Sequence, residues 1–211
     1  RTTRHEEDKT MAIELDTPQT SNRPPVIGAR GLGQIVKAMI VDKEMRPRVD
    51  KDGKAIMNSR GKPAQEEVLT VMVLEGTTGT VSGGDLNDDW TPETGSVARQ
   101  IFKGLAFGKL IDARKEIGGA TMVGDVIETR SISATVWRGQ GDIAAKDVTD
   151  QSTIDKARAK GLSVGWDIEV TYRRASAAEA GLVAKAEQLH MENRERITLD
   201  SKPAVELDDA F

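Results

Sequence analysis

The stretch EVLTVMVL at residues 67–74 decides the fold, because its β-branched and aliphatic residues predict a strand. Apolar side chains fall on both faces at its centre, and Glu75-Gly76 ends it. A similar run, QIVKAMIV at residues 34–41, follows three glycines and also predicts a strand. Turn signals at Asp52-Gly53 and Arg60-Gly61 lie between the two runs, so we expect a long hairpin.

Downstream of this hairpin, strand and helix patterns follow one another. We expect strands at 97–103, 126–137 and 166–172, and helices at 105–117 and 152–160. Simple alternation along 126–137 places Arg130 on one face and Trp137 on the other. Residues 76–95 are rich in Thr, Gly, Asn and Asp and are expected to form a polar surface excursion, and the aspartate-rich stretch after Trp137 a linker.

The two ends of the chain have different patterns. Residues 1–27 show no period and are expected to form a flexible arm before a single domain at 28–175. Ser176 and Glu179 form a capping-box pattern, which predicts a helix over 176–195. The narrow apolar stripe of this helix favours loose docking on the domain or on a partner. Residues 196–211 are expected to form an acidic flexible tail.

The order of these elements indicates a mainly β fold with some α-helix. Strand, strand, strand, helix, strand, strand is the connectivity of a five-stranded OB-fold barrel, whose helix lies between strands 3 and 4. A parallel α/β enzyme would show a helix after every strand.

Composition excludes several classes of site. The chain has no cysteine, and His5 and His190 are its two histidines, so we expect no disulfide, no metal and no cofactor. No apolar stretch approaches the roughly 20 residues that cross a bilayer, and Arg1–Asp16 has no apolar signal core, so we expect no membrane partner and a cytoplasmic location. Homo-oligomerisation stays open.

A basic segment stands out within an acidic chain of net charge −4. Between residues 46 and 62, six cations face two carboxylates, Asp50 and Asp52. In an OB-fold this hairpin flanks the binding face, where cations follow phosphates and aromatic rings stack on bases. A solvated hairpin tip is the alternative interpretation.

The few aromatic residues suggest further contacts with nucleic acid. Phe102 and Trp137 each precede a basic residue, and Trp90 lies in the polar excursion. The alternative role of Phe102, Trp137, Trp166 and Tyr172 is to fill the barrel. The full candidate set for nucleic-acid binding is Lys37, Arg46, Arg48, Lys51, Lys54, Arg60, Lys62, Trp90, Arg99, Phe102, Lys103, Arg130, Trp137 and Arg138.

Enzymatic chemistry finds little support in the sequence. Asp88-Asp89 and Asp208-Asp209 lie in polar segments, where their carboxylates would be solvated rather than poised by burial. The glycine-rich run at 28–33 opens no helix, so it is not a phosphate-binding loop. We therefore expect no catalytic residues and no enzyme.

Two short strings carry a resemblance to a known family. The run RQIFKG at 99–104 and the run VGDVI at 123–127 resemble the middle of phage-encoded OB-fold single-stranded DNA-binding proteins of actinobacterial viruses. The resemblance covers Ile35 to Tyr172 and departs at the inserts 76–95 and 138–163. It implies sequence-nonspecific binding of single-stranded DNA in phage replication or recombination, in the host-cell cytoplasm.

The end of the chain carries a second resemblance. The string LDDAF at 207–211 resembles the acidic, phenylalanine-terminated tails with which bacterial single-strand binders recruit replication proteins. It implies partner binding through Asp208, Asp209 and Phe211. The alternative function is a virion structural or assembly protein that uses a β-barrel as a packing block.

Overall fold

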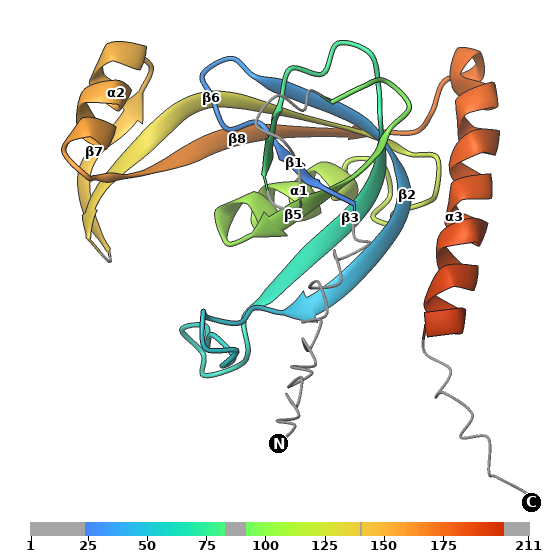
Figure 1. Cartoon of the computed structure of the whole chain (residues 1–211), viewed down its shortest axis with the longest axis horizontal. Helices are drawn as coiled ribbons and strands as arrows, with labels where there is room; N and C mark the ends of the chain where they lie inside the picture. Colours follow the sequence, from blue (N-terminus) through green and yellow to red (C-terminus); the bar gives the residue numbers. More distant parts are fainter. Residues whose placement is uncertain (1–23, 83–91, 140, 201–211) are drawn as a thin grey trace, which may run out of the picture.

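The predicted long hairpin lies at the centre of the fold, where β2 (Ile35–Pro47) pairs antiparallel with β3 (Gln65–Val73). The computed structural model describes residues 24–82, 92–139 and 141–200. Within these ranges the strands form one curled, open sheet in the order β4-β1-β5-β3-β2-β6 (Figure 1). Both β7 and β8 pair with β6.

The other elements follow the expected alternation in outline. The remaining strands are β1 (Val26–Gly28), β4 (Thr80–Ser82), β5 (Val97–Lys103), β6 (Val126–Gly139), β7 (Asp142–Val148) and β8 (Ser163–Arg173). The helices are α1 (Leu105–Lys115), α2 (Gln151–Ala159), the 3-10 turn η1 (Ala177–Glu179) and α3 (Ala180–Asp200). The predicted strands at 97–103, 126–137 and 166–172 and the predicted helices at 105–117 and 152–160 are therefore present. The first strand has the predicted bounds, and the other elements have shifted ends.

The central hairpin is buried on both faces, which explains why β3 is apolar on both. On one face Leu69 and Val71 pack in a core with Leu110 of α1 and Tyr172 of β8. On the other face Met39 and Met72 pack under α3, whose Ala186 is fully buried. The narrow apolar stripe predicted for the C-terminal helix therefore lies on the sheet, with Ala186 as the one buried residue among residues 180–195.

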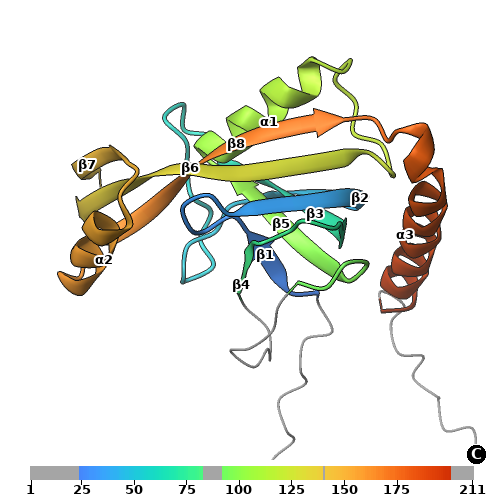
Figure 2. The same ribbon diagram turned by 90° about the horizontal axis from the view of Figure 1, so that it is seen from above.

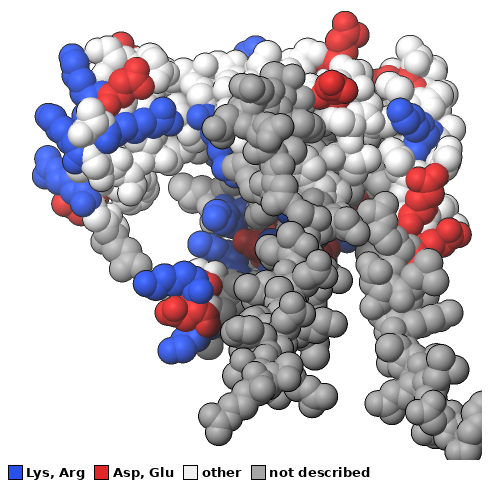
Figure 3. Space-filling view, viewed as in Figure 1, with Lys and Arg blue, Asp and Glu red and all other residues white. Residues whose placement is uncertain are grey.

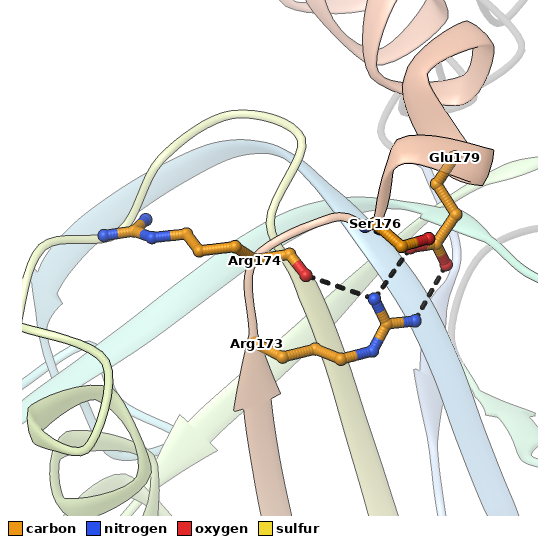
Figure 4. Close-up of polar contacts among 4 residues, drawn as sticks. All are labelled: Arg173, Arg174, Ser176 and Glu179. Carbon is orange, nitrogen blue, oxygen red and sulfur yellow. Dashed lines mark hydrogen bonds and ion pairs between the residues drawn. The ribbon is translucent and has the colours of Figure 1, made fainter.

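The start of α3 is tied to the end of β8 (Figure 4). Ser176 and Glu179 form the predicted capping box. Arg173 donates to both carboxylate oxygens of Glu179, at 2.7 and 2.8 Å. These bonds, together with the amide of Ser176, lower the pKa of Glu179 to about 2. The helix therefore begins at a charge-assisted junction, in addition to its apolar contact with the sheet.

Three strands were not expected from the sequence. β1 includes Ile27, which the sequence assigns to the flexible arm, and β4 lies in the polar excursion. β7 replaces the expected linker and pairs with the end of β6. β1 and β4 were missed because they have three residues each, too few to show a period. β7 was missed because it is polar: it pairs along one edge, and most of its residues face solvent.

A β-bulge overturns the expected faces of β6. Ser131 pairs with Ile168 of β8 and Ser133 pairs with the next residue, Asp167, so Ile132 has no partner. Such an extra residue exchanges the faces of the strand beyond it. Arg130 and Trp137 therefore share a face, contrary to simple alternation.

The sheet curls without closing in the part of the chain that the structure describes. Its pairings end at β8 on one side and at β4 on the other, and α1 lies against both β5 and β8. α2 and α3 stand at opposite ends of the molecule (Figures 1 and 2). None of the helices described is both long and apolar enough to cross a membrane.

Candidate nucleic-acid interface

The tip of the β2–β3 hairpin, residues 46–64, is a folded unit. Three backbone hydrogen bonds close a ring through positions eight residues apart. The amide of Arg48 donates to the carbonyl of Ala64 at 2.8 Å, that of Ala64 to Ile56 at 2.7 Å, and that of Ile56 to Arg48 at 2.9 Å. Because these backbone groups satisfy one another, the hairpin tip holds its shape with little buried apolar surface.

Two equivalent turns project from this ring. Asp50 Oδ1 accepts from the amides two and four residues later, both at 2.9 Å. Asn58 Oδ1 does the same at 2.9 and 3.1 Å. Gly53 and Gly61 sit at the same place in each turn with φ of 77° and 70°, a conformation that favours glycine. The signal in the sequence is a repeat eight residues apart, D-x-x-G-K and then N-x-x-G-K.

The cations of the hairpin tip are mostly free to meet a partner. The exposed ones are Lys51, Lys54, Arg60 and Lys62, and Arg48 is half-buried. Arg46 differs, because its Nε donates to Glu66 Oε1 at 2.6 Å and the ion pair offsets its charge. The structure thus brings five of the six predicted tip cations together, and none of the five forms an ion pair with a residue in the described ranges.

A second region with exposed cations contains the predicted Trp137 and Arg138 together with elements that the sequence analysis did not assign to the site. We call it the distal lobe: β7, α2 and the adjoining ends of β6 and β8, residues 134–139 and 163–166. Ile154 and Ala157 of α2 are buried, and Arg158 lies over the ring of Trp166 at 5.5 Å. Asp150 caps α2, and the hydrogen bonds from Thr153 lower the pKa of its carboxyl.

The distal lobe carries five exposed cations, of which Arg138 alone belongs to the predicted set. They are Arg138, Lys146, Lys156, Arg158 and Lys160, and they stand among four exposed aspartates, Asp142, Asp147, Asp150 and Asp155. Figures 1 and 2 place both the hairpin tip and the distal lobe on the side of the molecule away from α3. In Figure 3 the molecule is hollowed between them, and Lys and Arg side chains are seen on both regions, with Asp and Glu side chains among them.

Trp137 remains a candidate for stacking. Ala134 pairs with Trp166, which faces α2, so Trp137, three residues later, lies on the face away from α2. Its indole lies beside Gly165 and is half-buried. On the same face Ser133 and Thr135 donate to Asp167 Oδ2 at 3.1 and 3.0 Å, which orders the surface around the ring.

Other predicted contacts lie elsewhere. Phe102 is 2% exposed and belongs to the core with Leu110, so the expectation that it stacks on bases is wrong and the alternative, that it fills the core, holds. Tyr172 is also buried in that core. Arg99 Nε donates to the carbonyl of Pro24 at 2.8 Å, which ties β5 to the start of the described chain.

The remaining cations are dispersed. Lys103 is exposed at the end of β5, and Arg130 is exposed on β6. Lys37 lines a cavity of about 470 Å³ with Leu182 and Lys185 of α3, on the side of the sheet that α3 covers. Trp90, Asp208, Asp209 and Phe211 lie outside the described residues.

No family model matches the sequence, and neither the curated proteins nor the solved structures include a significant match.

Proposed function

We propose that the chain is a sequence-nonspecific single-stranded DNA-binding protein that acts in DNA replication or recombination. The observation that carries the proposal is that two regions with exposed cations, the hairpin tip and the distal lobe, lie on either side of one hollow (Figure 3). A single strand laid along this hollow would meet cations on both sides. Neutralised phosphates release counterions, which drives binding without any reading of bases.

The fold supports an OB-type interpretation of the curled sheet. β2, β3, β5, β6 and β8 follow the order of the five OB strands, and α1 comes between the third and fourth of them. In that fold the first hairpin and the loop between the last two strands border the ligand. Here the hairpin tip occupies the first of these positions, and the distal lobe is inserted at the second.

Stacking would add to the electrostatic attraction. Trp137 offers a half-buried ring on a face that it shares with Arg130. A base stacked on an aromatic side chain contributes about 1–3 kcal/mol and tolerates any sequence. Cations on an ordered surface, together with an aromatic side chain such as Trp137, are what a nonspecific single-strand binder requires.

Fluorescence anisotropy of a labelled poly-dT oligonucleotide at several salt concentrations tests the proposal. We expect binding at low salt that weakens as salt rises. Lys54→Glu with Lys62→Glu reverses the equivalent lysines of the two turns, and the matched control reverses Lys115 of α1 and Lys185 of α3, both exposed. The tip pair should lower the salt slope by more than about 1, since each lost phosphate contact removes about 0.7.

Two results would contradict the proposal. The first is absence of binding at low salt. The second is equal loss of affinity in the tip variant and in the control, which would mean that net charge alone matters. A virion assembly protein, the alternative function, would instead self-associate at low salt without binding poly-dT.

A further inference from the structure

The hairpin tip has an exposed apolar side as well as its basic turns. The isolated bridges pair Val49 with Ala55 and Met57 with Pro63. Because Ala55 and Met57 are two residues apart on one extended segment, all four side chains lie on the same outer side. Val49 is 55% exposed and Met57 59% exposed. We call these four residues the apolar patch.

The fold does not require the apolar patch. The hairpin tip is held by its backbone ring and by the side-chain oxygens of its two turns, none of which involves these side chains. Exposed Val and Met side chains gathered on a small projecting unit indicate a contact surface. Because the ring holds them in place, little conformational entropy is lost when they meet a partner.

The charges around the apolar patch identify the chemistry of that partner. One turn, with Lys51 and Lys54, follows Val49, and the other, with Arg60 and Lys62, follows Met57. An apolar surface between two cationic turns matches the end of a base-pair stack, where a flat apolar face lies between two phosphate strands. Proteins that separate bases insert Met, Pro and similar side chains in this way.

We propose that the apolar patch packs against the last base pair where single-stranded DNA meets a duplex, and unstacks it. The inference rests on the proposed function and adds a substrate class to it: a junction rather than a strand alone. The two turns would then each meet one of the two diverging backbones. The single strand would continue into the hollow towards the distal lobe.

A tailed duplex with 2-aminopurine at its junction base pair tests this inference. The probes are the tailed duplex and the poly-dT tail alone, and 2-aminopurine fluorescence rises when the base unstacks. The test variant is Val49→Ser with Met57→Ser, which leaves every charge of the hairpin tip in place. The matched control is Met122→Ser with Met191→Ser, because both methionines are exposed outside the hairpin tip, one in the turn before β6 and one on α3.

The expected results separate the two proposals. The unsubstituted protein should raise the fluorescence and bind the tailed duplex about tenfold more tightly than the tail, from stacking on the end pair. The test variant should lose the fluorescence rise and the preference for the tailed duplex, but keep its affinity for the tail. The control should keep the fluorescence rise, the preference and the affinity. No binding of the tail at low salt would defeat the proposed function itself.

Other outcomes overturn only the inference. One is a tail-binding protein that leaves the fluorescence unchanged. Another is a test variant that behaves like the control. A third is flotation with anionic phosphatidylserine vesicles that the test variant loses, without any change in fluorescence, because it would assign the apolar patch to a lipid surface.

Discussion

Asp50 and Asn58 accept the same pair of backbone hydrogen bonds in two turns eight residues apart, although one side chain is charged and the other is neutral. The geometry of the turn therefore does not need the charge of Asp50. Each turn is a natural control for the other.

This equivalence allows charge to be changed without changing shape. Asp50→Asn should tighten poly-dT binding by about two- to fivefold at low salt, because a carboxylate leaves a cationic surface. Asn58→Asp should weaken it by a similar factor. Anisotropy titrations measure both, and near-identical thermal unfolding of the two variants would show that the turns are intact. If both substitutions changed the affinity in the same direction and by the same factor, the hairpin tip would not be part of the interface.

The ion pair between Glu67 of β3 and Arg114 of α1 should be costly to break. Arg114 donates to Glu67 Oε1 at 2.6 Å, and Glu67 is 2% exposed. Glu67→Leu or Arg114→Met alone leaves a buried charge unpaired and should lower the free energy of unfolding by about 3–5 kcal/mol. The double variant should lose less free energy of unfolding than the sum of the two single losses. Urea unfolding measures the cycle, and additive losses would contradict the pairing.

Tyr172 should resist ionisation until the protein unfolds. It is the single tyrosine of the chain, and it donates to Asp125 Oδ2 at 2.9 Å. Burial, and the nearby Asp125 carboxylate, raise its pKa above the usual value of 10.0. Because the unfolded chain releases this proton first, the contribution of Tyr172 to stability is complete below pH 10 and falls as the pH rises beyond it. Phenolate absorbance should therefore appear together with unfolding, and Tyr172→Phe should lose this alkaline dependence.

Glu179 should contribute to stability near neutral pH and lose that contribution in acid. Its pKa falls from 4.5 to about 2 in the folded chain, so its stabilising effect is present above 4.5 and is lost as the pH falls towards 2. Arg173 is 42% exposed, so solvent screens the pair and limits the effect to less than about 1 kcal/mol. Urea midpoints of the unsubstituted protein and Glu179→Gln should converge below pH 4.5. A constant gap across that range would contradict the assignment.

Sequence reasoning succeeded where a pattern extended over many residues. The hairpin of β2 and β3, the long β6 and the capping box at Ser176 all carry local signals that the fold preserves. It failed where long-range pairing decides the structure. β1 becomes a strand through pairing with β4 and β5, distant in sequence. The bulge at Ile132 appears only in the register with β8.

The candidate site divides in the same way. A count of charges identified the cations of the hairpin tip. Gly53 and Gly61 marked its two turns, because each adopts a positive φ there. Of the five exposed cations of the distal lobe the sequence analysis included Arg138 alone, because these cations alternate with four aspartates in sequence and β7 was not predicted. Phe102 was ambiguous, because a ring beside a lysine fits a core as well as a surface.

The position of α3 over Met39 and Met72 gives this protein an internal chemical reporter. Both thioethers are fully buried while the helix is in place, so peroxide should oxidise them far more slowly than the exposed Met191. Gly124 has a φ of 86°, and a methyl group there would lie 2.8 Å from Val183 Cγ1, so Gly124→Ala should lift the helix and speed oxidation at both buried sulfurs. Mass spectrometry of the peptides would then report how often the helix leaves the sheet, with or without poly-dT in the solution.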